Sequence, residues 1–297
     1  MTDDPQKDMW SDWLLRRRHP VDEAVANDWM KRVHELRDRV LDGANMKAGD
    51  TVLDVGAGDG LIAFGALDRV GPRGRVIFSD ISRPLLDECQ RIARDLGVED
   101  RCEFINASAG DLAGIADESV DIVTTRSVLI YLKDKESSFR AFYRVLRPGG
   151  RISLFEPVGR ITADVFIALQ QREAVEPSEI SGLEERLGSY LSAFQPAGED
   201  PMSDFDERDL LRHCIAAGFD DVHLKLEVDV THGDPMSWEA WASVAPNPRL
   251  PSLAEAMEHV LSIDERAAYE RVHRPIIEAG ANRVVMCHAW LTATKAE

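Results

Sequence analysis

Three closely spaced glycines and one acidic residue form the pattern in this chain that best fits a ligand site. Gly56, Gly58 and Gly60 follow the apolar run Thr51–Val55, and glycines at this spacing let a backbone turn sharply and approach a ligand closely. Asp80 follows at a distance where a carboxylate can accept hydrogen bonds from both hydroxyls of a ribose. Together these residues predict a binding site for a nucleoside cofactor.

The spacing of the glycines discriminates between cofactors. A dinucleotide fingerprint needs the pattern G-x-G-x-x-G, but its third glycine would fall on Leu61, and this chain has G-x-G-x-G instead. The spacing therefore argues against a nicotinamide-dependent (NAD or NADP) oxidoreductase, which is one alternative function for such a loop. A second alternative is an interaction protein that binds a cofactor without catalysing a reaction.

Strand and helix patterns alternate around these residues. Short apolar runs predict strands, and the segments between them carry apolar residues at helical spacing. The predicted strands are Thr51–Val55, Arg75–Ser79, Cys102–Asn106, Val120–Thr125 and Arg151–Phe155. Right-handed helical crossovers between such strands predict a doubly wound α/β sheet, whose ligands bind beyond the carboxyl ends of the strands.

The second half of the chain predicts two further strands separated by insertions. Residues Val222–Val230 alternate between polar and apolar, as in an edge strand with one solvated face, and Val284–Thr292 forms the closing strand. The stretches 159–205 and 233–282 interrupt this pattern with short helical segments and prolines. We interpret both as helical insertions into one domain that spans residues 48–297.

Residues 1–47 form a predicted helical arm that divides at His19–Pro20, because proline restricts the residue before it. The arm carries Trp10, Trp13 and Trp29. These side chains either dock the arm on the main domain or line a substrate pocket beneath it. In the second case the arm acts as a lid, and its exchange between two subunits would give a homodimer.

Two segments of the chain resemble a known family. The loop Val52–Gly60 is similar to the first motif of class I S-adenosylmethionine-dependent methyltransferases, and the turn Leu146–Arg151 resembles another element of that family. The resemblance covers roughly residues 48–158. It implies a Rossmann-like, seven-stranded, mostly parallel sheet with an antiparallel last strand, S-adenosyl-L-methionine as cofactor, and methyl transfer as the activity.

The resemblance also implies which residues bind the cofactor. It assigns the methionine end to Asp54, Gly56, Ala57 and Gly58, the ribose to Asp80, the adenine to Ile81, Ser108 and Ala109, and the path beneath the sulfonium to Arg126 and Ser127. Ser108 stands where family members often carry an acid, and its hydroxyl can accept the same hydrogen bond. From the residues alone, Asp54 can also anchor the turn, and Asp80 can also cap the helix that follows.

Three side chains are candidates for catalysis: Glu156 after the fifth strand, Tyr131 after the fourth strand, and His19 in the arm. A displacement at a sulfonium depends chiefly on alignment in a dry site, so a general base is optional. The alternatives are that Glu156 caps a helix or contacts a lid, and that Tyr131 is a buried aromatic residue. The sequence leaves open whether oxygen, nitrogen, carbon or sulfur accepts the methyl group.

Composition limits the partners. The net charge of −18, from 53 acidic and 35 basic residues, would repel a nucleic-acid backbone and favours a small-molecule or short-peptide acceptor. The cysteines lack C-x-x-C spacing and the histidines lack metal-ligand spacing, so we predict no metal. Without an apolar run of about 18 residues or an apolar signal core, we expect a cytoplasmic protein with no membrane partner.

Overall fold

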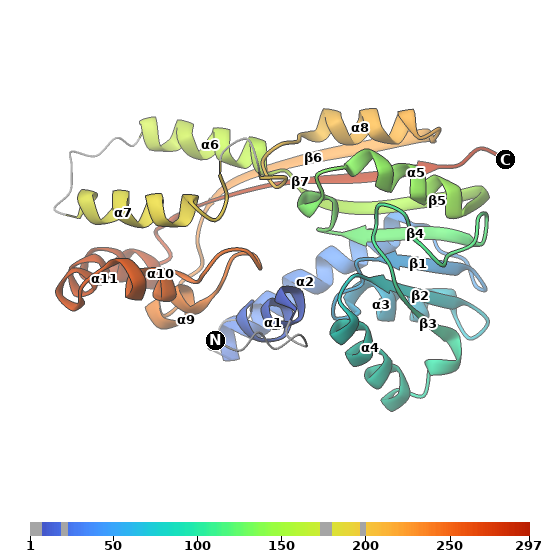
Figure 1. Cartoon of the computed structure of the whole chain (residues 1–297), viewed down its shortest axis with the longest axis horizontal. Helices are drawn as coiled ribbons and strands as arrows, with labels where there is room; N and C mark the ends of the chain where they lie inside the picture. The colour runs from blue at the N-terminus through green and yellow to red at the C-terminus, as the bar shows by residue number, and fades with distance from the viewer. Residues whose placement is uncertain (1–7, 19–22, 173–179, 197–199) are drawn as a thin grey trace.

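The computed structural model describes residues 8–18, 23–172, 180–196 and 200–297. These residues form a seven-stranded sheet with the order β3-β2-β1-β4-β5-β7-β6 (Figure 1). The strands are β1 (Thr51–Val55), β2 (Arg75–Asp80), β3 (Cys102–Asn106), β4 (Val120–Arg126), β5 (Leu146–Pro157), β6 (Asp220–His232) and β7 (Arg283–Thr294). Strands β1 to β5 run parallel, whereas β7 is antiparallel to both β5 and β6. The predicted fold class is confirmed.

Strand β5 begins earlier than its sequence pattern predicts. The turn expected at Arg147–Gly150 lies inside the strand, and the pairing register shifts between Val120 and Ile122 of β4. Gly149 adopts a φ of +74° and donates its N–H to the carbonyl oxygen of Lys295 at 2.9 Å. The segment after β7 therefore holds this irregular part of β5 in place.

Helices cover both faces of the sheet (Figure 1). The face covered by α2 (Glu23–Gly43), α3 (Leu61–Val70) and α4 (Arg83–Asp95) lies opposite the face covered by α5 (Lys135–Val145) and α8 (Glu207–Ala216). Each face buries its own apolar cluster. Leu41 and Phe78 belong to the first cluster, and Phe139 and Phe142 belong to the second. Two short 3-10 turns, η2 (Glu99–Arg101) and η3 (Leu129–Tyr131), complete this part of the chain.

Local sequence determines where helices begin next to the carboxyl ends of the parallel strands. Helix α3 starts directly after Gly60, whose φ of +83° suits glycine. Helix α4 starts after Ser82, whose hydroxyl accepts a hydrogen bond from the N–H of Leu85, and Pro84 stands in its first turn. Both helices therefore begin close to the ends of β1 and β2, and the loops between them meet at one edge of the sheet.

The arm lies over this edge. It consists of α1 (Met9–Asp12) and a π-helical turn, η1 (Trp13–Arg17), followed by α2. The carboxylate of Asp8 caps α1 and also accepts a hydrogen bond from the hydroxyl of Ser82 at 2.7 Å. The continuous pair α1 and η1 forms one helical segment and α2 forms the second, as predicted. The predicted break at His19–Pro20 lies outside the described residues.

The two insertions pack against each other at the far end of β6 and β7 (Figure 1). Their helices are α6 (Gly159–Arg172) and α7 (Ser181–Ser192) from the first, and α9 (Trp238–Ser243), α10 (Leu253–Val260) and α11 (Ile263–Glu278) from the second. Leu187 of α7 shares a third buried cluster with Trp238, Met257 and Tyr269. We call this cluster with α7 and α9 to α11 the helical module. The division into an arm of 1–47 and a domain of 48–297 stays a prediction.

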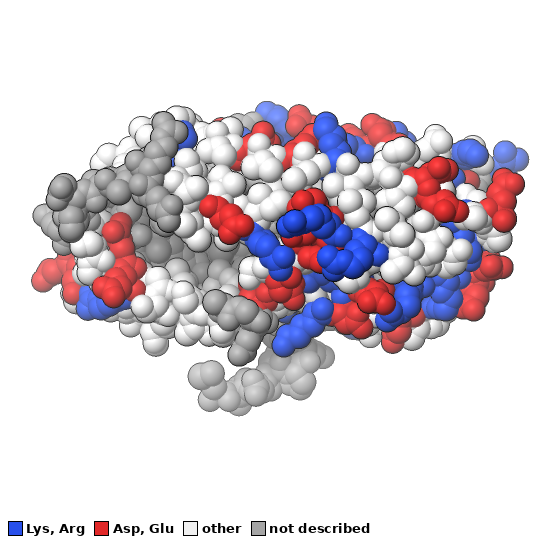
Figure 2. All heavy atoms as spheres, turned by 90° about the horizontal axis from the view of Figure 1, so that it is seen from above, with Lys and Arg blue, Asp and Glu red and all other residues white. Residues whose placement is uncertain are grey.

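Charged side chains of both signs share the surface. Figure 2 shows Lys and Arg interspersed with Asp and Glu on one face of the molecule. Salt bridges on α5 and α8, such as Arg140 with Glu136 and Arg208 with Asp206, place basic groups beside acidic ones. Among the described helices, none has the length and apolar character that crossing a membrane requires.

Candidate active site

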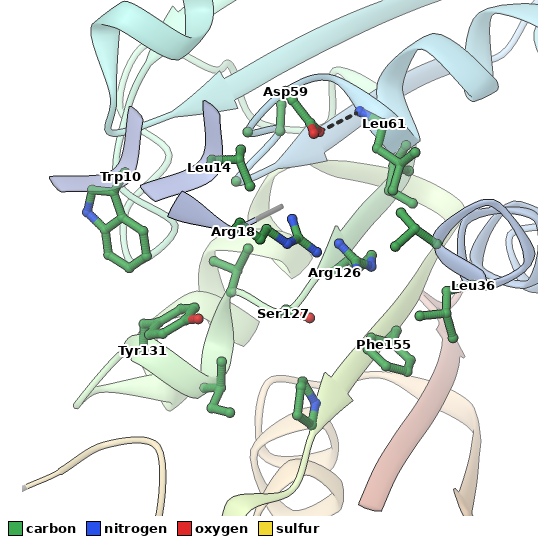
Figure 3. Close-up of a pocket in the computed structure, with 18 of the residues that line it drawn as sticks. Trp10, Leu14, Arg18, Leu36, Asp59, Leu61, Arg126, Ser127, Tyr131 and Phe155 are labelled. Carbon is green, nitrogen blue, oxygen red and sulfur yellow. Dashed lines mark hydrogen bonds between the residues drawn. The ribbon is translucent and has the colours of Figure 1, made fainter. Parts of the chain in front are cut away.

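A cavity of about 940 Å³ lies at the carboxyl ends of the parallel strands, beneath the arm (Figure 3). Its lining comes from the glycine loop after β1, the ends of β2 and β4, helix α2, and strands β5 to β7. The cofactor residues that the sequence predicts all line it: Asp54, Gly56, Ala57, Gly58, Asp80, Ile81, Ser108, Ala109, Arg126 and Ser127. Their individual roles toward the cofactor remain predictions.

The glycine loop has a conformation that other residues would strain. Gly56 and Gly58 have φ values of +68° and +56°, and a Cβ atom on Gly56 would lie 2.2 Å from a methyl carbon of Val128. The N–H groups of Gly56 and Ala57 both donate to the carbonyl oxygen of Ser79, at 2.7 and 3.0 Å. Backbone hydrogen bonds therefore fix the loop against β2 before any ligand binds.

Two buried aspartates flank this loop. The carboxylate of Asp80 accepts hydrogen bonds from the N–H groups of Gly58 at 2.9 Å and Ser82 at 2.8 Å. Asp54 accepts one from the hydroxyl of Thr124 at 2.9 Å, and its other carboxylate oxygen is buried with no partner. Burial raises the pKa of both groups, that of Asp54 to about 7. Because Asp54 lines the cavity, its carboxylate would suit a cationic ligand group such as the ammonium of S-adenosylmethionine.

Glu156 occupies a different place from the one expected of a proton acceptor. It is fully buried, and its oxygens accept hydrogen bonds from the N–H groups of Val128, Leu129 and Ile130 at 2.9 to 3.1 Å. Burial raises its pKa to about 7 despite these bonds. The carboxylate thus holds the turn η3 at the end of β4, and it is not among the described cavity-lining residues. Its catalytic role stays a prediction that this geometry does not favour.

Tyr131 lines the cavity, in contact with the arm. Its ring meets Trp10 edge-on at a centroid distance of 4.9 Å, and burial raises the pKa of its hydroxyl to about 12. The phenol therefore stays protonated near neutral pH and can donate a hydrogen bond. Trp13 also lines the cavity while its indole N–H donates to Ala245 at 2.8 Å, so it docks the arm and forms part of the pocket wall. His19 lies outside the described residues.

Sequence reasoning missed several residues that line the cavity. His288 on β7 packs its ring 4.7 Å from that of Phe155, and burial lowers the pKa of its imidazole. Trp290, on the same strand, donates its indole N–H to Glu227 at 2.9 Å. Arg18 reaches in from the arm (Figure 3). These residues carry no motif, and only the pairing of β5 with β7 and the docking of the arm bring them to the site.

Residues 25–172 match the model of the ubiE/COQ5 methyltransferase family. The chain belongs to the class I S-adenosylmethionine-dependent methyltransferases. Its cofactor is S-adenosyl-L-methionine, and the match gives no support to the nicotinamide-dependent alternative.

A curated relative of this chain is the ubiquinone/menaquinone biosynthesis C-methyltransferase UbiE of Klebsiella pneumoniae. The two are 35% identical over 134 residues, which are 44% of this chain and 53% of the relative. The chain thus spans about half the length of the curated relatives it matches.

Solved structures share the fold of this chain at low sequence identity. The YcgJ protein of Bacillus subtilis gives a TM-score of 0.54 at 18% identity, over 89% of this chain and 99% of that one. The geranyl diphosphate C-methyltransferase of Streptomyces coelicolor, solved with S-adenosyl-L-homocysteine, gives 0.51 at 16% identity, over 94% and 87%.

Proposed function

We propose that this protein transfers a methyl group from S-adenosylmethionine to a small molecule or short peptide by in-line displacement. The observation that carries the proposal is a single cavity with two chemically different ends. One end holds the glycine loop, Asp54 and Asp80, and the other is walled by the arm, Phe155 and β7. Bound S-adenosylmethionine supplies an electrophilic methyl group on a sulfonium.

The residues at the two ends would hold donor and acceptor in line. Asp80 and the loop fix the nucleoside over β1 and β2, and Asp54 faces the amino group. The acceptor lies over β4, β5 and β7, where Phe155 is buried, while the buried arm residue Leu14 covers the glycine loop, so that both ends exclude water. Alignment in a site that excludes water accounts for much of the rate of such a displacement.

Two side chains near the acceptor can handle protons. The lowered pKa of His288 leaves its imidazole neutral near pH 7, so it can accept a proton. The raised pKa of Tyr131 makes it a hydrogen-bond donor. We therefore propose His288, ahead of Glu156, as the group that takes a proton from an oxygen, nitrogen or carbon acceptor.

The family match does not identify the acceptor. The curated relative is a C-methyltransferase by name, but the family model ends at residue 172, before β6 and β7. His288 and Trp290, which form part of the acceptor wall, lie beyond it.

The test begins with isothermal titration of the protein with S-adenosylmethionine and S-adenosylhomocysteine. We expect dissociation constants in the micromolar range, and absence of binding at micromolar ligand concentrations would refute the proposal. Incubation of cell extracts with deuterated-methyl cofactor, followed by mass spectrometry, should then reveal a labelled product. Tight cofactor binding with no labelled product across a broad acceptor panel would instead favour the catalytically silent interaction protein.

We also propose the cytoplasm as the location. The four cysteines are free thiols in the structure, as a reducing compartment maintains them. Exchange of the arm in a homodimer stays a prediction, which light scattering of the full chain and of a chain without residues 1–18 would check.

A further inference from the structure

Two arginines face the cavity without a carboxylate partner. Figure 3 shows the side chains of Arg18 and Arg126 pointing toward one another inside it. The Nε atom of Arg126 is buried and has no hydrogen-bond partner, and within the described ranges neither guanidinium forms an ion pair. Burial lowers the pKa of both groups, that of Arg126 to about 10, so Arg126 stays charged near neutral pH.

Another arginine of the same cavity, Arg39, has a carboxylate partner that balances its charge. Arg39 donates two hydrogen bonds to Glu227, one of them at 2.8 Å, and its guanidinium lies 3.8 Å from the centre of the Trp290 ring. By contrast, the guanidinium carbon of Arg18 lies 5.2 Å from the centre of the Trp13 ring and 5.8 Å from the centre of the Trp29 ring. A buried cation without a counter-charge is costly unless a ligand supplies one.

Arg126 ends β4 between the glycine loop and the acceptor end, because its neighbour Thr125 pairs with Val55 of β1. It pairs in register with Phe155 of β5, which in turn pairs with Trp290 of β7. The three residues thus form one row across the sheet, leading away from Asp80 and the adenine end. Two acids lie nearby without an ion pair to either arginine: the charge of Asp59 acts against the lowering of the pKa of both, and that of Glu156 acts in the same way on Arg126.

We propose that Arg18 and Arg126 bind an anionic group of the methyl acceptor, a carboxylate or a phosphate, whose apolar body packs on Phe155 and the aromatic residues of the arm. Guanidinium groups match the geometry of both oxyanions. The acceptor is thus a small organic acid. The inference rests on the proposed function, since it names the acceptor class for the same cavity.

The experiment uses protein saturated with S-adenosylhomocysteine, whose carboxylate is then already in place. Isothermal titration compares 1-naphthoate and 1-naphthyl phosphate with neutral 1-naphthamide, in the wild-type protein and in Arg126→Gln and Arg18→Gln. The control is Arg91→Gln, because Arg91 pairs with Glu88 and Asp95 on the exposed surface of α4. Thermal melting reports folding, and Arg18→Gln keeps the test available if Arg126→Gln does not fold.

We expect one or both anions to bind the wild-type complex at least tenfold more tightly than the amide, and the stronger of the two identifies the oxyanion. Each cavity variant should lose this preference while its affinity for S-adenosylhomocysteine changes less than threefold. Equal binding of anions and amide would overturn the proposal. So would variants that weaken S-adenosylhomocysteine as much as the anions, since the arginines would then serve the cofactor.

Failure of the proposed function has a different signature. If the wild-type protein does not bind S-adenosylhomocysteine, the methyltransferase proposal fails, and the same three probes are titrated without cofactor. A preference for an anion that both arginine variants abolish and Arg91→Gln retains would still support the anion site. Absence of that preference would refute it.

Discussion

The two ends of the cavity are held together in different ways. At the cofactor end, the loop after β1 and the start of α4 are fixed by hydrogen bonds from backbone N–H groups to Ser79 and Asp80. At the acceptor end, side chains from distant segments meet, such as Trp10 with Tyr131 and Arg39 with Glu227. The first end comes mainly from two adjacent strands, to which the arm adds the hydrogen bond between Ser82 and Asp8, whereas the second exists only when the arm and β7 are assembled.

This difference teaches that the two ends can be perturbed separately. The helical module has its own buried cluster and supports the arm through contacts such as Trp13 with Ala245 and Arg17 with Glu255. A defect in the module should therefore alter the acceptor wall, and a defect in the loop should alter cofactor binding. Four predictions follow this division, ordered from the largest effect to the smallest.

Trp238→Ala should disrupt the helical module and leave the cofactor end intact. Trp238 is almost completely buried in the module, and truncation of a buried tryptophan costs about 3–5 kcal/mol. Hydrogen exchange should accelerate in α7 and α9 to α11, while the affinity for S-adenosylhomocysteine stays within about threefold, or ~0.7 kcal/mol. Ile263→Ala, at a residue 76% exposed on the same module, is the control. Loss of cofactor binding in Trp238→Ala would contradict the separation.

Asp80→Asn should weaken S-adenosylhomocysteine binding about 100-fold, because two hydrogen bonds to a charged carboxylate, each worth about 1.5 kcal/mol, would weaken. The same carboxylate also orders Gly58 and Ser82, so a melting curve must accompany the titration. Asp87→Asn on the exposed side of α4 serves as the control, since Asp87 pairs with Arg83. Unchanged affinity in Asp80→Asn would remove the ribose assignment.

Gly56→Ala should destabilise the loop more than Gly97→Ala does. The two glycines have nearly the same φ, +68° and +69°, but an added Cβ atom meets Val128 at Gly56 and open space at Gly97. Positive φ costs about 1–2 kcal/mol for alanine at either site, so chemical denaturation of both variants isolates the cost of the clash. Equal loss of stability would show that Val128 can move aside.

Cofactor affinity should depend on the ionisation of Asp54. Its pKa is raised to about 7, so the carboxyl is mostly protonated at pH 6 and mostly ionised at pH 8, and an ammonium group binds the ionised form. Affinity for S-adenosylhomocysteine should therefore rise about tenfold from pH 6 to pH 8. The stability of the unliganded protein runs the other way, because a raised pKa contributes stability that is lost as the pH rises through 7. Asp54→Asn should flatten the titration.

The strands and the cofactor end could be predicted from the sequence because their determinants are local. Gly56, the acid Asp80 and the period-two pattern of β6 each act within one or two elements. Even so, β5 differs from its pattern, because the chain after β7 bonds to Gly149 and draws a predicted turn into the strand.

The acceptor end could not be predicted in the same way. Arg18 and His288 lie near opposite ends of the chain, and only the tertiary structure brings both of them to one cavity. Glu156 shows a further limit of prediction from sequence. An acid at the end of a strand suggests chemistry, but three backbone N–H groups use its carboxylate to hold a turn. The sequence of Glu156 and its neighbours carries no sign of those hydrogen bonds.

The long pair of β6 and β7 has an evolutionary consequence. The chain leaves the sheet along β6, builds α9 to α11, and returns along the adjacent β7 (Figure 1). A segment inserted between neighbouring antiparallel strands can be lengthened, shortened or exchanged without shifting the pairing of β1 to β5. Selection for a new acceptor can therefore act on this segment while the donor site stays unchanged, so one donor chemistry becomes available to many acceptors.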